Sequence, residues 1–281
     1  MNRFHSLTFL LSVVLFAGMI RLHVLGAGGA LPTTDRGPAA YWLEIDGHGL
    51  LLDPGPGALV RLVRGPGAPD GVDTVPAVLL SHMHLDHAAD LAPLLFALHS
   101  VLARTAPPLL LAGPPGLAGY LDRLRELYGD WLAPRAREIE VREMSPGEAV
   151  RLAGGGRAEC FAVDHREGRF SRVCLGWTFR DASGRRLVYS GDTGPSDELA
   201  RQARGCNLLL VECTTPDDLA VAGHLSPAQV AALVRGAQPD LVVLTHLYPL
   251  VARLAPDAVV QAASGVRCVA ARDGDVFTLG G

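Results

Sequence analysis

Ser81-His82-Met83-His84-Leu85-Asp86-His87 places three histidines and an aspartate within six residues, and this stretch decides the fold. The apolar run from Val75 to Leu80 leads into it and is typical of a buried strand. Residues two apart in an extended chain face the same side, so the first two histidines can point at one spot. The last two residues follow the strand and can turn toward a neighbouring spot. A histidine-rich surface loop is the alternative, but a buried strand would then feed a costly, unsatisfied polar cluster.

The composition predicts one α/β domain. The chain has 281 residues and is 49% hydrophobic, which is enough for a large core. A net charge of −4 gives no basic footprint for a polyanion such as a nucleic acid. The cysteines show no C-x-x-C spacing, so we expect buried thiols rather than a disulfide framework. They are Cys160, Cys174, Cys206, Cys213 and Cys268.

The N-terminal segment allows two interpretations. A short apolar core, Leu7 to Phe16, makes residues 1–18 similar to a signal peptide, and it is too short to span a membrane. Yet Met19 to Leu25 predicts the first strand at once, without a spacer. Either the protein is exported, or residues 1–18 are an upstream extension, Met19 is the true start and the protein is cytoplasmic. We favour the second interpretation and expect a single domain over residues 19–281, with no membrane span in it.

Hydrophobic periodicity predicts the other elements. Helices are expected at 88–103 and 117–128, and strands at 41–45, 50–52, 109–112, 138–144, 149–152 and 158–163. The glycine-rich turn at 26–32 ends in a proline instead of a helix, which argues against a dinucleotide site. We expect this loop to run near the floor of the metal site.

Three later apolar strands also deliver polar residues at their C-terminal ends. They end at His165, at Asp192 and at His246. In layered α/β folds the sites lie at these ends, so four such strands together indicate one site. Asp53 follows a strand before a Pro-Gly turn. It is either a turn former or a partner that orients a ligand.

The predicted ligands divide into two sets of three and a bridge. The first set is His82, His84 and His165, and the second set is Asp86, His87 and His246. Asp192 can bridge the two ions. Imidazole suits zinc, and carboxylates can hold or bridge a second ion. These seven ligands predict two transition metal ions, preferably zinc, with manganese or iron as alternatives. They leave coordination positions open for the water that hydrolysis needs.

In this order the residues resemble the metallo-β-lactamase superfamily, from about Ile20 to Gly281. The resemblance implies a four-layer αββα sandwich, an α/β (α+β) fold with two metals in the cleft between the sheets. The segments 190–195 and 223–226 further resemble the ribonuclease Z branch. In that branch a glutamate holds a histidine that assists phosphodiester cleavage, and Glu212 and His224 match these positions. We therefore expect Asp86, Glu212 and His224 to carry the reaction.

The sequence also departs from its relatives. The main dizinc β-lactamases carry a cysteine where this chain has Asp192. The segment from Gly116 to Ala158 lacks the basic arm with which ribonuclease Z grips transfer RNA. We therefore expect small or cyclic phosphodiesters as substrates. The alternatives are a thioester, lactone or sulfate ester hydrolase, ribonuclease Z-type processing, and a metal-binding module without turnover. His224 could also only cap a helix. Relatives in this branch are often dimers, so a homodimer is one alternative.

Overall fold

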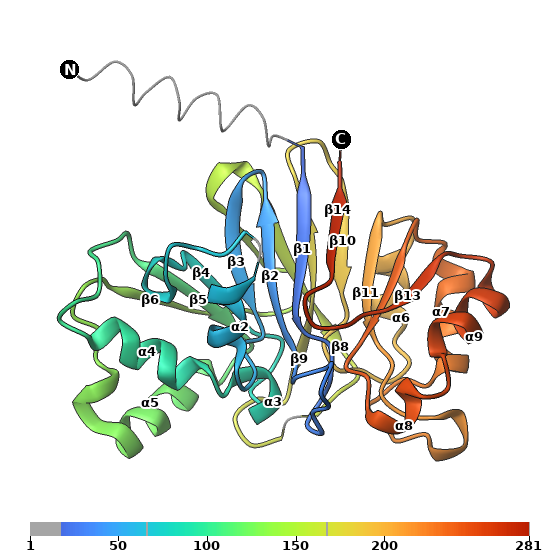
Figure 1. Cartoon of the computed structure of the whole chain (residues 1–281), viewed down its shortest axis with the longest axis horizontal. Coiled ribbons are helices and arrows are strands. Elements are labelled where there is room, and N and C mark those ends of the chain that lie inside the picture. The colour runs from blue at the N-terminus through green and yellow to red at the C-terminus, as the bar shows by residue number, and fades with distance from the viewer. Residues whose placement is uncertain (1–17, 66, 167, 281) are drawn as a thin grey trace.

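Two seven-stranded sheets pack face to face in the computed structural model, which describes residues 18–65, 67–166 and 168–280 (Figure 1). The first sheet runs in the order β14 (Val276–Leu279), β1 (Ile20–Gly26), β2 (Ala40–Ile45), β3 (His48–Leu52), β4 (Ala77–Leu79), β5 (Leu109–Gly113) and β6 (Ile139–Glu143). The second runs in the order β13 (Cys268–Ala270), β12 (Val242–Thr245), β11 (Leu208–Glu212), β10 (Arg186–Tyr189), β9 (Cys174–Arg180), β8 (Arg157–Val163) and β7 (Ala149–Arg151).

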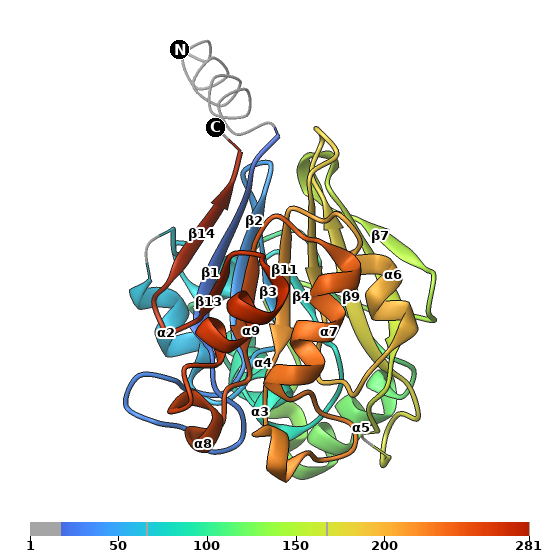
Figure 2. The ribbon, with the colours of Figure 1, turned by 90° about the vertical axis from the view of Figure 1, so that its right-hand side faces the viewer.

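Helices cover the outer face of each sheet. On the first sheet lie α2 (Ala58–Arg64), α4 (Leu91–His99) and α5 (Leu117–Tyr128), with the short α3 (Leu85–Ala88) below. On the second lie α6 (Asp197–Ala203), α7 (Pro227–Ala237) and α9 (Pro256–Ser264), with α8 (Pro249–Ala252) after β12 (Figure 2). Short 3₁₀ helices span Val72–Thr74, Gly129–Leu132, Ala153–Gly155 and Asp217–Leu219. This is the predicted αββα sandwich.

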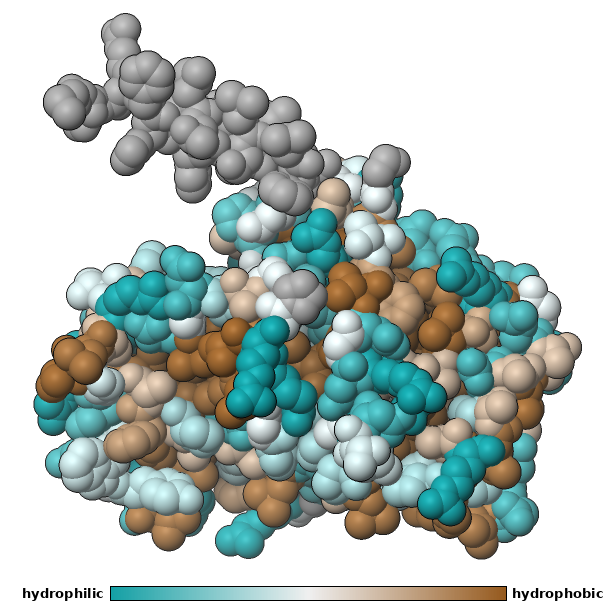
Figure 3. Space-filling view, viewed as in Figure 1, coloured by the Kyte–Doolittle hydropathy of each residue, from teal (hydrophilic) through white to brown (hydrophobic). Residues whose placement is uncertain are grey.

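Alternation along the strands explains the layers. In β2, Tyr41 and Leu43 point into the core between the sheets, whereas Trp42 points at the helices. In β3, Leu52 faces the inner core and Leu51 the outer one. Successive strand residues point to opposite faces, so a strand that is apolar on both faces is buried on both. The outer surface in Figure 3 mixes hydrophilic and hydrophobic side chains.

The topology brings several strand ends to one edge. Strands β10, β11 and β12 are parallel to one another, and β4 is parallel to β3 and β5. The C-terminal ends of β4 and of the β10–β12 group meet at the lower edge of the sandwich in Figure 1. The loops that carry the predicted ligands therefore leave the two sheets beside each other.

The helix expected at 88–103 is shorter in the structure, where α4 spans Leu91–His99 and a turn separates it from α3. Asp90 causes this break. Its two carboxylate oxygens accept hydrogen bonds from the amides of Gly57 and Leu59, each at 3.0 Å, at the start of α2. The strand expected at 75–80 is also shorter, since Pro76 has no amide to donate. Strands β9, β13 and β14 were not predicted.

Residues 1–17 lie outside the described part of the chain, so the signal-like segment stays a prediction. Gly18 and Met19 are described, and the amide of Gly18 donates to the Asp46 carboxylate at 2.6 Å. Among the residues that are described, no helix is long and apolar enough to cross a membrane. All five cysteines are buried, and burial raises the pKa of the Cys206 thiol to about 12.

Candidate active site

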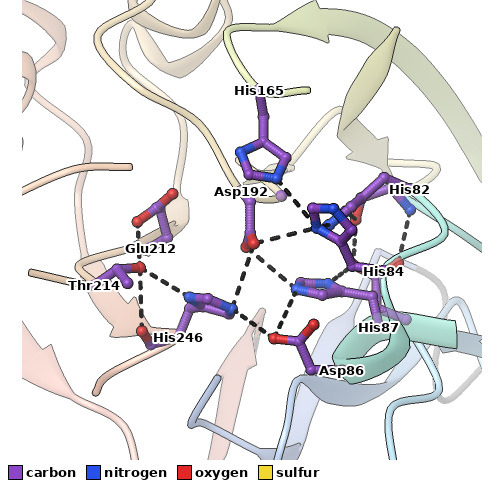
Figure 4. A network of polar contacts seen from close by, with 12 residues as sticks. His82, His84, Asp86, His87, His165, Asp192, Glu212, Thr214 and His246 are labelled. Atoms are coloured by element: carbon purple, nitrogen blue, oxygen red, sulfur yellow. Dashed lines mark hydrogen bonds and ion pairs between the residues drawn. The ribbon is translucent and has the colours of Figure 1, made fainter. Parts of the chain in front are cut away.

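The seven predicted ligands lie together at the edge where the strand ends meet (Figure 4). The turn after β4 and helix α3 bring residues from the first sheet. Loops after β8, β10 and β12 bring His165, Asp192 and His246 from the second sheet. The left-handed backbone of His246, with a φ of 53°, turns its side chain away from the strand. Such a conformation is costly for a side chain other than glycine and is common at functional sites.

The first predicted set forms a compact group. His84 Nδ1 lies 2.9 Å from His82 Nε2 and 3.3 Å from His165 Nε2. One oxygen of Asp192 is 3.8 Å from His82 Nε2. One ligand atom from each of these four residues lies within 4.8 Å of the others, so the group could hold a metal ion.

The second predicted set lies on the other side of Asp192. Asp86 Oδ2 is 3.3 Å from His246 Nε2 and 3.9 Å from His87 Nε2. Asp192 Oδ1 lies 3.3 Å from His87 Nε2, and its Oδ2 lies 3.4 Å from His246 Nε2. The carboxylate of Asp192 thus faces both sets, as a bridging ligand would.

Two atoms of this cluster test whether a metal ion fits. His87 Nε2 and Asp192 Oδ1 are buried, and neither has a hydrogen-bond partner within the described residues. Buried polar atoms without partners are costly, and a cation between them would satisfy both. Nitrogen and carboxylate ligands are those that zinc takes. Burial opposes a charge on His87, but Asp192 and Asp53 outweigh it and raise its pKa, whereas burial lowers the pKa of His82 and of His84.

Each imidazole that points Nε2 at the centre is held by its other nitrogen. The Nδ1 partners are Ser81 Oγ for His82 at 3.0 Å, Asp53 for His87 at 2.9 Å, the Gly223 carbonyl for His165 at 2.9 Å, and Thr214 Oγ1 for His246 at 2.8 Å. An Nδ1–H that donates outward leaves the lone pair of Nε2 free for a metal. The arrangement therefore fixes one tautomer for all four rings.

Asp53 is a buried carboxylate that contacts the predicted ligand His87. It is fully buried and accepts from the Ser81 amide at 2.7 Å, the Ser81 hydroxyl, His87 Nδ1 and the Tyr189 hydroxyl at 2.7 Å. Because Ser81 donates its proton here, its oxygen accepts from His82. The sequence analysis missed Ser81 and Tyr189 as supports, since a hydroxyl in a strand or turn carries no distinguishing pattern.

Glu212 is the centre of a second hydrogen-bond network, separate from that of Asp53. Its Oε1 accepts from the amide of Thr193 at 2.7 Å and from His224 Nδ1 at 3.0 Å. Its Oε2 accepts from the Thr214 hydroxyl and from the Leu225 amide at 3.1 Å. Glu212 is thus saturated with donors and orients His224 directly. Sequence analysis missed Thr214, although it lies only two residues after Glu212.

His224 borders both predicted ligand sets. Its ring centroid lies 5.0 Å from that of His165 and 5.7 Å from that of His246. Burial disfavours the charged ring, but the hydrogen bond and charge of Glu212 prevail and raise the pKa of His224. One ligand atom each from His224, Asp192 and His246 lies within 4.8 Å of the others. The geometry therefore places an imidazole that Glu212 holds beside both predicted ligand sets.

The glycine-rich loop runs beside the site, as expected. A Cβ on Gly29 would lie 2.9 Å from His246 Nε2 and 2.2 Å from Tyr248 Cε1, so only glycine fits there. Tyr248 was not predicted as a site residue. With five imidazoles and two carboxylates between two sheets, this centre defines a metal-dependent hydrolase.

Known proteins agree with this class. The model of the β-lactamase superfamily domain matches residues 48–247. A ribonuclease Z of Methanosarcina acetivorans is 29% identical over 272 residues, covering 82% of this chain and 88% of that protein. An uncharacterized protein of Mycobacterium leprae, ML1173, is 31% identical over 237 residues, covering 83% and 80%. The metallo-β-lactamase fold protein YhfI from Bacillus subtilis has a TM-score of 0.76 at 21% identity, covering 92% of this chain and 99% of that chain.

The chain therefore belongs to the β-lactamase superfamily domain family, and it has homologues named ribonuclease Z.

Proposed function

We propose that this protein is a phosphodiesterase of small or cyclic phosphodiesters, with two zinc ions held by the seven predicted ligands. Manganese and iron are the alternative metals. The observation that carries the proposal is the Glu212–His224 pair, 3.0 Å apart, beside a centre that Asp192 can bridge. A metal centre alone is enough for a generic hydrolase. A proton donor fixed beside the metal centre is suited in addition to a leaving oxygen that develops negative charge, as in phosphodiester cleavage.

The residues divide the work as follows. When bound, divalent ions would supply a nucleophile from water at neutral pH and polarise the phosphoryl group. Asp86 keeps 15% of its side chain exposed and would accept a hydrogen bond from the attacking water. Glu212 holds His224 Nδ1, so Nε2 is the nitrogen that donates to the leaving oxygen. Asp53 keeps His87 oriented.

The net charge of the chain and the elements between Gly116 and Ala158 favour small substrates. The net charge is −4, which disfavours binding to a phosphate backbone. Between Gly116 and Ala158 the chain forms α5, two 3₁₀ turns, β6, β7 and the start of β8, so regular elements fill much of this segment. RNA processing is the second candidate, because the relatives named ribonuclease Z cover most of this chain.

The test combines substrate profiling with two variants. The parent should hydrolyse bis-p-nitrophenyl phosphate with a higher kcat/KM than a β-lactam or a thioester. His224→Ala should keep its metals and lose about 10²–10³-fold in turnover, the usual effect of removing such a donor. Glu212→Gln should show a milder loss, with the exposed Glu126→Gln as its control.

Two outcomes would contradict the proposal. Parental turnover in metal-loaded His224→Ala would exclude the proton-donor role and favour a generic metallohydrolase. A preference for a thioester, lactone or sulfate ester would move the activity to another bond at the same centre.

A further inference from the structure

Tyr248 is the aromatic residue that follows the predicted ligand His246 by two positions. It stands just before α8, and its ring centroid lies 5.6 Å from the His246 ring. The His224 ring lies 5.7 Å from the same imidazole. Tyr248 and His224 therefore both lie beside His246, although they come from different parts of the chain.

Backbone contacts fix the Tyr248 ring in this place. The carbonyl of Tyr248 accepts from the Ala252 amide at 3.0 Å, in the first turn of α8. The amide of Leu247 donates to Ala27 at 3.0 Å and so ties the glycine-rich loop to the end of β12. Gly29 then packs directly on the ring, where a Cβ would approach to 2.2 Å. A side chain that its neighbours fix in one position is suited to binding a substrate.

The hydroxyl of Tyr248 keeps a proton that it can donate. The Tyr248 side chain is half-buried beside His246, and the backbone of Ala30 donates toward its hydroxyl oxygen. Over the part of the chain that is described, no group accepts its proton. A phenol keeps its proton at neutral pH, so it can donate to an anionic oxygen.

We propose that Tyr248 is a substrate-binding residue that donates a hydrogen bond to a non-bridging oxygen of the phosphoryl group. This inference rests on the proposed phosphodiesterase function and deepens it. His224 then serves the leaving oxygen, and Tyr248 serves an oxygen that stays on phosphorus. The ligand class is a tetrahedral oxyanion, and free phosphate is its smallest member.

Tyr248→Phe tests the proposal because it removes only the hydroxyl and keeps the ring against His246. The dissociation constant of inorganic phosphate, measured by calorimetry on the metal-loaded protein, should rise about 10-fold, as expected for one hydrogen bond to a charged group. KM for bis-p-nitrophenyl phosphate should rise with it, and metal content should stay unchanged. Tyr128→Phe, on the exposed end of α5, is the matched control.

A second variant tests the placement. Gly29→Ala keeps the hydroxyl but forces the Tyr248 ring away, so it should weaken phosphate binding to a similar extent; its metal content is measured as well, because the added Cβ also approaches His246. Parental phosphate affinity and KM in Tyr248→Phe would overturn the role of Tyr248. A parent enzyme that binds phosphate through Tyr248 but hydrolyses no phosphodiester would overturn only the proposed function.

Discussion

Replacing Asp53 by asparagine tests whether the buried carboxylate holds the second predicted ligand set. The two side chains have nearly the same shape, but asparagine has one acceptor oxygen and a donor group in place of the other. Asp53 accepts four hydrogen bonds, three of them at Oδ2 and one at Oδ1. In either orientation an amide NH₂ group must therefore face at least one of these donors.

The magnitude follows from this count. If the amide oxygen takes the place of Oδ2, the NH₂ group opposes the Ser81 amide. If it takes the place of Oδ1, the NH₂ group opposes His87, Tyr189 and the Ser81 hydroxyl. One buried donor without a partner costs about 1–3 kcal/mol, and the remaining bonds lose the added strength of a charged acceptor. We expect the free energy of unfolding of the metal-free protein to fall by about 3 kcal/mol.

Metal affinity should fall as well. Changing the partner of a metal-binding histidine typically costs about 10–100-fold in affinity. Competition with a chromogenic chelator would measure the zinc affinity, and urea unfolding would measure stability, with Asp70→Asn as an exposed control. Zinc affinity within a factor of about two of the parent, together with parental stability, would refute the assignment of Asp53 as a support.

Three further predictions follow from the site and the charge of the chain. Metal analysis should find about two equivalents of transition metal, preferably zinc, and a His82→Ala/His84→Ala variant that kept both would refute the predicted sets. A chain beginning at Met19 should fold and be fully active, because β1 starts at Ile20; aggregation of that chain, together with export and cleavage of the full chain, would favour the signal-peptide interpretation. Precursor transfer RNA should be processed poorly compared with small phosphodiesters, and efficient cleavage at its 3′ end would contradict this.

The sequence predicted that the candidate ligands lie close together, because strand ends are easy to recognise. An apolar run that stops at a histidine or aspartate shows both the element and the place of the polar residue. The parallel order of β10, β11 and β12 then brings those ends together. The helix pattern at 88–103 missed the turn before α4 for the opposite reason. Asp90 reads as an ordinary helical residue, and only the distant start of α2 shows why the chain breaks there.

The supporting residues were harder to predict, because their roles depend on contacts across the fold. Tyr189 meets Asp53 over a separation of 136 residues, and Thr214 meets His246 over 32. Serine, threonine and tyrosine are common in strands and turns, so their residue types alone indicate nothing. Strand β9 was missed because Gly176 interrupts its apolar pattern; in the structure the Phe161 ring fills the space above that glycine.

The buried polar contacts beneath the site also fix the position of one sheet relative to the other. The predicted ligands come from both sheets, so their spacing depends on the register of one sheet against the other. Apolar packing is not directional and leaves this register weakly specified. Among the described residues, buried hydrogen bonds cross the interface just beneath the predicted ligands, and three of them use aromatic side chains. They are Tyr189 to Asp53 at 2.7 Å, Tyr41 with Thr245 at 2.6 Å, and Trp177 to the Leu80 carbonyl at 3.2 Å. Each involves a residue within three positions of a predicted ligand or of its partner. The same contacts that satisfy buried aromatic side chains therefore hold the two halves of the centre at a fixed separation.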